Sequence, residues 1–137
     1  MRALMLVLAL GACAVPEPEN VEALAPDGFA EAIEISRLEW ASRLGADLGP
    51  APRVRWFKGH CLRYLGDDGP CLAGRFYSYP GEEPQIHLTV SRPSLSALPH
   101  EMLHWALDEV GDSDSDHRTA PWLEVQDVRM MLAGAGL

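Results

Sequence analysis

The alternation of hydrophobic and polar positions predicts one helix followed by three strands in the first part of the folded region. Hydrophobic residues near helical spacing predict a helix from residue 27 or 28 to about residue 47, which ends before Gly49 and Pro50. Short runs rich in aromatic and β-branched residues, separated by turn residues, then predict strands at 54–57, 74–79 and 85–90.

In the last of these strands, Ile86, Leu88 and Val90 alternate with His87 and Thr89. Because successive side chains of a strand point to opposite faces, one face is apolar and the other is polar. The polar face is suited to line a cleft. We expect His87 to be an ordinary, half-exposed residue of that face, with contact to a metal or a substrate as the alternative.

Two further helices are predicted, at 94–110, with Pro99 in the first turn, and at 121–132, which Pro121 opens. The order helix, strands, helix, helix predicts an α+β domain in which a small, mainly antiparallel sheet packs with about three helices. A chain of 137 residues has room for one such domain, at 27–137, so any active site is expected to be a shallow cleft.

Residues 1–12 combine a basic start, a short apolar run and small residues. This pattern predicts a secretory signal peptide. A transmembrane anchor is disfavoured, because the apolar run is far too short to span a bilayer. The sequence Leu10-Gly11-Ala12-Cys13 resembles the lipobox of bacterial lipoproteins, which implies that Cys13 is acylated and anchors the chain to a lipid bilayer. An ordinary cleavage site with an unrelated cysteine is the alternative.

Residues 13–26 are rich in Pro and Glu, which predicts a solvated, lipidated tether. Ala14, directly after the cysteine, resembles the residue found there in outer-membrane lipoproteins of Gram-negative bacteria. We therefore expect an exported protein that is lipid-anchored in the bacterial cell envelope, at the outer membrane and facing the periplasm.

The net charge of the chain bears on the class of partner that it can bind. The net charge is −9, and it is one unit more negative without residues 1–12, which argues against a nucleic acid partner.

Export places Cys61 and Cys71 in an oxidising compartment, and turn residues lie between them. We predict that these cysteines form a disulfide, in preference to a metal site.

His100, Glu101 and His104 form an H-E-x-x-H pattern inside the predicted helix 94–110. The four-residue spacing places both imidazoles on one face, close enough to hold one ion, and zinc accepts neutral imidazole nitrogen readily. Glu101 can approach the same ion from the side without binding it. It is then placed to take a proton from a water on the zinc.

This stretch resembles the active-site helix of the zincin metallopeptidases, over about residues 85–124. The resemblance implies an upstream sheet whose edge strand receives a peptide, then this helix, then a third zinc ligand downstream. The metzincin branch is excluded, because Leu107 and Val110 stand where that branch has a glycine and a third histidine. We expect substrate to lie along the strand that ends near Val90.

Two residues compete to be the third ligand. His117 lies just beyond a loop that can return over the metal, whereas Glu124 has a spacing similar to that of the gluzincin branch, where a glutamate on the next helix completes the site. We favour His117, because the residues around Glu124 do not match the rest of the gluzincin pattern. Asp116 and Asp108 are further alternatives for the third ligand. Both are also candidates for residues that support a metal ligand without binding the metal, and Asp108 would do so by orienting an imidazole.

The combined pattern predicts a zinc-dependent metallopeptidase in which zinc activates water and Glu101 acts as general base. Tyr77, Tyr79 and His87 are the candidates for stabilising the oxyanion. The alternative from a different class is a non-catalytic zinc-binding envelope lipoprotein that serves as an interaction module. An inactive relative that binds peptides is a third interpretation.

Overall fold

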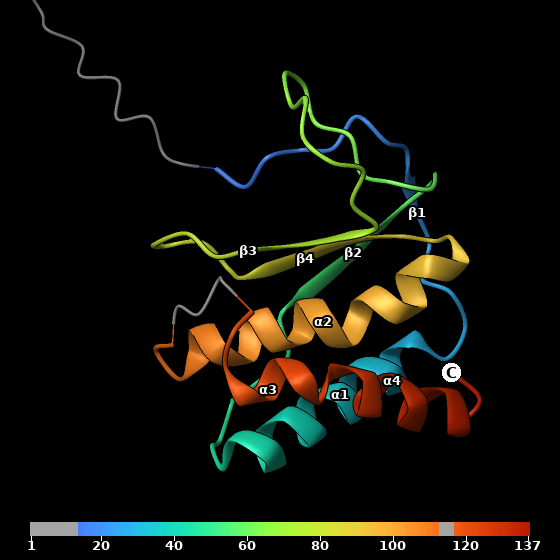
Figure 1. The fold of residues 1–137 in the computed structure, drawn as a ribbon. Coiled ribbons are helices and arrows are strands. Elements are labelled where there is room, and N and C mark those ends of the chain that lie inside the picture. The colour runs from blue at the N-terminus through green and yellow to red at the C-terminus, as the bar shows by residue number, and fades with distance from the viewer. Residues whose placement is uncertain (1–13, 113–116) are drawn as a thin grey trace, which may run out of the picture.

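The computed structural model describes residues 14–112 and 117–137 (Figure 1), with the backbone alone for residues 92–96. The predicted signal peptide, Cys13 and Asp116 lie outside the described residues, so what we expect of them stays a prediction. The elements follow one another as β1 (Glu22–Ala23), α1 (Phe29–Leu44), β2 (Arg53–Phe57), β3 (Gly74–Tyr77), β4 (Gln85–Thr89), α2 (Arg92–Glu109), α3 (Ala120–Leu123) and α4 (Val125–Gly134). The α+β class is confirmed.

The sheet has the strand order β1-β2-β4-β3. β1 runs antiparallel to β2 and β3 antiparallel to β4, but the central pair, β2 and β4, is parallel. A parallel pair needs a long crossover connection, which the segment from residue 58 to residue 84 supplies. β4 is paired on both sides, so our expectation that substrate lies along the strand ending near Val90 is wrong. The edge strands are β1 and β3.

The helices described by the structure lie on one face of the sheet (Figure 1). α2 packs directly against the sheet, and α1 and α4 pack against α2. Because α2 has neighbours on both sides, it is apolar around most of its circumference. Five of its side chains are at most 1% exposed: Leu98, Met102, Leu103, Trp105 and Ala106.

The ends of the helices differ from the predictions where local backbone geometry decides them. α1 ends at Leu44, before the expected end near residue 47, because Gly45 adopts a left-handed φ of 63°. α2 begins two residues before the predicted start, so Pro99 lies inside the helix and not in its first turn. The predicted helix 121–132 is divided at Glu124 into α3 and α4.

The opposite face of the sheet is covered by the connection between β2 and β3 (Figure 1). The predicted disulfide between Cys61 and Cys71 is confirmed, with the two Cα atoms 5.2 Å apart. An isolated bridge pairs Leu62 with Leu72 directly beside it. The disulfide therefore closes this connection into a compact cover, whose buried side chains form a second, smaller core with Phe57.

This cover corrects our prediction for the polar face of β4. His87 and Thr89 are both fully buried, so the face does not line a cleft and His87 is not half-exposed. The imidazole of His87 lies between aromatic rings, and its Nδ1 is 3.0 Å from the hydroxyl oxygen of Tyr64. The alternation in the sequence predicted the two faces correctly, but it carried no information about what covers the polar one.

The described part of the predicted tether, residues 14–26, lies against the sheet. β1 pairs with β2, and Arg55 of β2 forms ion pairs with Glu17 and Glu22 at 2.8 and 3.1 Å. The side chain of Asn20 donates to the carbonyl oxygens of Lys58 and Cys61. These contacts hold the segment close to the domain. In the part of the chain that the structure describes, no helix is both long and apolar enough for a membrane crossing.

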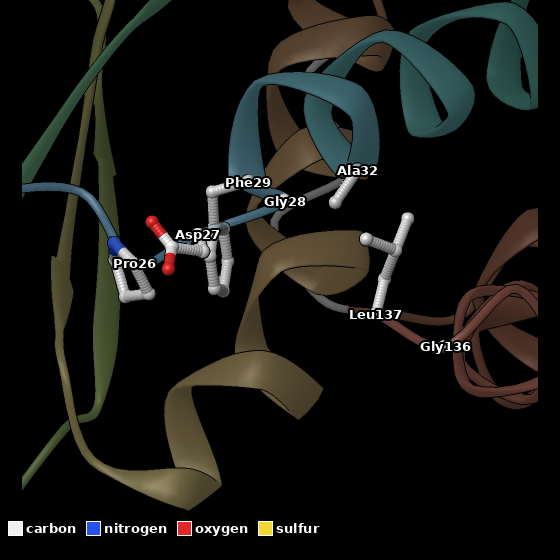
Figure 2. Close-up of a pocket in the computed structure, with 7 residues that line it drawn as sticks. All are labelled: Pro26, Asp27, Gly28, Phe29, Ala32, Gly136 and Leu137. Atoms are coloured by element: carbon white, nitrogen blue, oxygen red, sulfur yellow. The ribbon is translucent and has the colours of Figure 1, made fainter.

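The C-terminal end of the described chain packs beside the start of α1 (Figure 2). Leu137 lies over Gly28, where an added Cβ would come within 2.7 Å of its Cδ2 atom. Gly28 also has a φ of 82°, which favours glycine. A small pocket of about 210 Å³ remains here, lined by Phe29 and Ala32 among others. It is far too poor in convergent polar groups to be the functional site.

Candidate metal centre

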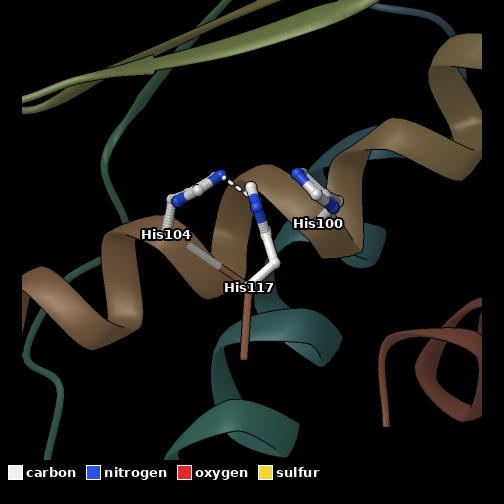
Figure 3. A group of neighbouring side chains, drawn as sticks. All are labelled: His100, His104 and His117. Carbon is white, nitrogen blue, oxygen red and sulfur yellow. Dashed lines mark hydrogen bonds between the residues drawn. The ribbon is translucent and has the colours of Figure 1, made fainter. Parts of the chain in front are cut away.

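Three histidines converge at one point, two from α2 and one from the segment before α3 (Figure 3). His100, His104 and His117, which we call the histidine cluster, each offer a ring nitrogen, and these atoms all lie within 4.8 Å of one another. The Nε2 atoms of His104 and His117 are 3.1 Å apart. A tetrahedral zinc ion with bonds of about 2.1 Å needs ligand nitrogens roughly 3.4 Å apart, so small side-chain rotations suffice. The cluster can therefore hold a metal ion.

The packing of α2 fixes the first two members of the cluster. His100 and His104 lie one turn apart, with their ring centroids 5.0 Å apart, on the sector of the helix that the core leaves free. The rest of the helix is clamped between the sheet and the outer helices, and the indole of Trp40 donates to the carbonyl oxygen of Pro99 at 3.1 Å. Two candidate ligands are thus held in position by the packing of the chain itself.

His117 reaches the cluster through an unusual backbone conformation. Its φ is 56°, the one left-handed value among the non-glycine residues that the structure describes. Such a conformation is uncommon for a residue with a Cβ, and backbone strain of this kind collects at functional sites. The turn directs the imidazole back onto α2, where its ring lies 4.9 Å from each of the other two rings. His117, which we favoured as the third ligand, is the residue that joins the pair.

Trp122 forms a wall beside the cluster, which our sequence analysis missed. Its ring lies 4.1 to 5.0 Å from each of the three imidazoles, measured between centroids. The indole Nε1 atom is buried and has no hydrogen-bond partner among the described residues. In the sequence Trp122 was only an apolar position of a predicted helix. The proximity of its ring excludes water from one side of the cluster, and this strengthens electrostatic interactions there.

Burial keeps the helix imidazoles neutral. Loss of solvation, with a smaller contribution from electrostatic repulsion within the cluster, lowers the pKa of both His100 and His104 to about 4. At neutral pH both rings therefore have a free lone pair. A neutral imidazole is the form that binds a divalent metal ion.

Glu101 lies on the side of α2 that faces the sheet and is 7% exposed. Burial raises the pKa of its carboxyl group to about 7, while a hydrogen bond from the backbone N–H of Phe76 and the charge of Arg75 act in the opposite direction. The close approach of α2 to β3 depends on Gly74, where an added Cβ would lie 2.9 Å from Cγ of Glu101. A carboxyl group that titrates near neutral pH is suited to exchange a proton.

The other residues that we singled out lie away from the histidine cluster. Glu124, the alternative third ligand, forms an ion pair of 2.7 Å with Arg43 of α1. Asp108 accepts a hydrogen bond of 2.8 Å from Ser78, and in the described chain no imidazole is its partner, so the expectation that it orients one is wrong.

The three candidates for oxyanion stabilisation also lie elsewhere. Tyr77 and His87 are buried on the far face of the sheet, and Tyr79 packs against the small core there. The sheet itself separates them from α2, so none of them is placed to contact a group bound at the histidine cluster. The sequence showed their polarity but not which face of the domain they occupy.

The known proteins add nothing to this geometry: no family model, no curated protein and no solved structure matches the chain.

Proposed function

We propose that the chain is a zinc-dependent metallopeptidase whose zinc ion is held by His100, His104 and His117. The observation that carries the proposal is the convergence of three imidazoles, one of which belongs to the residue directly before Glu101, whose carboxyl group is buried. Three neutral nitrogen ligands with a fourth position left open are typical of catalytic zinc, whereas structural zinc usually has four protein ligands. Borderline-soft imidazole donors favour zinc over magnesium or calcium, which prefer oxygen.

The residues of the proposed site have two roles, which are metal binding and proton transfer. Zinc, when bound, supplies a Lewis acid that polarises a carbonyl group and makes a water molecule more acidic. Glu101 accepts the proton of that water and returns it to the leaving amine. Its pKa of about 7 applies to the metal-free protein, and a nearby dication lowers it, which favours the carboxylate form that a general base needs.

A non-catalytic zinc-binding module remains the second candidate, and one observation favours it. The Glu101 carboxyl group is buried at the contact of α2 with β3 and accepts a hydrogen bond from the backbone of Phe76. A group held in this way also serves as a fixed packing element between helix and sheet. The two candidates differ in what they require of Glu101, because only the peptidase needs it to move a proton.

The test combines zinc content with hydrolysis in wild type, Glu101→Gln and a matched control. Full-length chain purified in detergent is reconstituted with zinc, its metal is measured by elemental mass spectrometry, and it is incubated with a quenched-fluorescence peptide library. The peptidase proposal expects one zinc per chain in all variants and no hydrolysis by Glu101→Gln. His60→Ala, which removes an exposed histidine outside the cluster, is expected to behave as wild type.

Zinc binding without hydrolysis in wild type would favour the non-catalytic module. An absence of bound zinc would rule out both candidates. Equal hydrolysis by wild type and Glu101→Gln would remove Glu101 from the mechanism, because the isosteric amide cannot accept the proton.

We further propose that acylated Cys13 anchors the chain in the bacterial envelope, where peptides or proteins of the periplasm are its substrates. The proposal rests on the lipobox-like sequence before Cys13. Replacing Cys13 with Ser is expected to abolish incorporation of labelled fatty acid and to release the protein from the membrane fraction. Unchanged membrane association of the variant would contradict the anchor.

A further inference from the structure

The tether is bound to the domain from its second described residue onward. The side chain of Val15 packs against the small core beneath the cover, residues 58–73. The backbone N–H of Glu19 donates to the carbonyl oxygen of Arg63 at 2.7 Å. The side-chain oxygen of Asn20 accepts a hydrogen bond of 2.7 Å from the backbone N–H of Arg63. A segment with these contacts is part of the folded domain and does not act as a free linker.

The chain between this bound segment and the proposed lipid anchor is short. Only Ala14 separates Val15 from Cys13, the residue that we propose to be acylated. Two steps along the chain span at most about 7 Å. The headgroup region on each side of a bilayer is about 5–8 Å thick. When the acyl chains on Cys13 enter the hydrocarbon core, the part of the domain that holds Val15 must therefore lie at the membrane surface.

The surface next to Val15 has the apolar and aromatic groups that suit such a position. Pro16, Leu65 and Tyr79 line one hollow of the surface, and we call these three residues the anchor-side surface. Leu65 is 89% exposed. An exposed leucine needs no explanation by itself, but this one lies beside the segment that leads to the anchor. Tyrosine is enriched at membrane–water interfaces, because its ring is apolar and its hydroxyl is polar.

The net charge of the chain shows that the anchor, and not electrostatic attraction, must supply this contact. The charge is −9, so an anionic bilayer does not attract the chain as a whole. Covalent acyl chains instead raise the local concentration of the anchor-side surface at the bilayer. We therefore expect the contact to depend on the acyl chains and on the short span between Cys13 and Val15.

We propose that the anchor-side surface rests on the lipid bilayer, so that the cover faces the membrane and the histidine cluster faces away from it. The start of the tether and the cover lie on one face of the sheet, and α2 lies on the other (Figure 1). The proposed zinc site is then open to the aqueous compartment. Its substrates are soluble peptide segments and not segments embedded in the bilayer. This inference rests on the proposed acylation of Cys13 and adds the orientation of the domain.

The test compares two leucines of similar exposure on opposite faces of the sheet. Leu65 of the cover is 89% exposed and Leu123 of α3 is 85% exposed. Leu65→Cys and Leu123→Cys are each labelled with an NBD fluorophore, and the acylated full chain is reconstituted into vesicles of phosphatidylethanolamine and phosphatidylglycerol. A lipid with a nitroxide on its headgroup is added as quencher. Quenching by about half is expected at residue 65, and none at residue 123.

A second variant lengthens the tether and leaves the domain unchanged. About twelve Gly and Ser residues are inserted between Ala14 and Val15, and such a linker has an average end-to-end distance of about 17–21 Å. The domain can then leave the membrane surface, so quenching at residue 65 is expected to fall to the level at residue 123. His104→Ala is expected to abolish zinc binding and to leave the quenching at both positions unchanged, because the orientation does not depend on zinc.

The outcomes separate this inference from the proposals on which it rests. If the wild type incorporates no labelled fatty acid, the proposed anchor is contradicted and the inference fails with it. An acylated chain with equal quenching at residues 65 and 123 overturns the inference alone. Undiminished quenching in the lengthened chain also overturns it, because the short span would then not be the cause. A blue-shifted NBD emission at residue 65 that the nitroxide lipid does not quench would place another copy of the chain on this surface, and would overturn it as well.

Discussion

The two histidine environments of this domain share a lowered pKa but differ in where their nitrogen lone pairs point. Burial lowers the pKa of His87 on one face of the sheet, and of His100 and His104 on the other, in each case to about 4. The lone pairs of the helix histidines converge with that of His117. The imidazole of His87 instead bonds to Tyr64 and packs among aromatic rings. Burial and a lowered pKa therefore do not by themselves indicate a group that can hold a metal ion, whereas convergence of lone pairs does.

The largest expected effect is on zinc affinity, which is expected to depend on the two helix histidines and not on His87. His100→Ala and His104→Ala are each expected to weaken zinc binding more than about 100-fold, because losing even a supporting residue of a zinc site costs 10–100-fold. His87→Gln is expected to leave zinc affinity unchanged. Competition with a fluorescent zinc chelator measures all three. A loss of zinc affinity in His87→Gln would break the comparison, because it would couple the two faces of the sheet.

The disulfide lies on the sheet face that carries His87, opposite to the face that carries the histidine cluster. Replacing Cys61 and Cys71 with Ser opens a loop with a sequence separation of 10 residues, which is expected to lower the free energy of unfolding by about 2–3 kcal/mol. Urea unfolding followed by circular dichroism gives this value. Zinc affinity of the folded variant is expected to stay the same, and a decrease would show that the cover over His87 supports the histidine cluster.

The pH dependence of the free energy of unfolding tests the environment of His87. An unfolded histidine titrates near pH 6.5, and burial, with a contribution from the charge of Arg55, lowers the pKa of His87 to about 4 in the folded chain. Between these values the unfolded state binds more protons than the folded state. The stability that this difference contributes is thus complete above pH 6.5 and is lost as the pH falls toward 4.

His87→Gln keeps a hydrogen-bonding side chain that does not titrate. It is expected to lose about 2 kcal/mol less than wild type between pH 7 and pH 4, as measured by urea unfolding of the zinc-free proteins. His100 and His104 titrate in both proteins, so their contribution cancels in the difference. Parallel stability curves for the two proteins would mean that His87 does not have the buried, neutral environment described above.

The smallest expected effect concerns the alternative ligand. Glu124→Gln removes an ion pair with Arg43 that is partly exposed, so it is expected to cost less than about 1 kcal/mol of stability and no zinc affinity. Asp127→Asn, which alters a longer contact of 3.9 Å to the same arginine, is the matched control. A tenfold loss of zinc affinity in Glu124→Gln alone would assign Glu124 to the metal site in place of His117.

Local patterns in the sequence determined much of this protein. The period of α2, the spacing of His100 and His104, the three longer strands and the disulfide were all predicted from neighbouring residues, because each depends on contacts within a few residues or on one short loop. The assignment of His87 and Thr89 to one face of β4 was also correct, since alternation is a property of the strand itself.

Only the tertiary structure decided what lies against those local elements. The parallel pairing of β2 with β4, the cover over His87, the position of Trp122 and the contact of Glu124 with Arg43 join segments that are distant in the chain. Such contacts follow from how the whole chain buries its apolar surface, and no short pattern records that outcome. The histidine cluster combines both levels: the helix period pairs two ligands, and the fold of the chain brings the third to them.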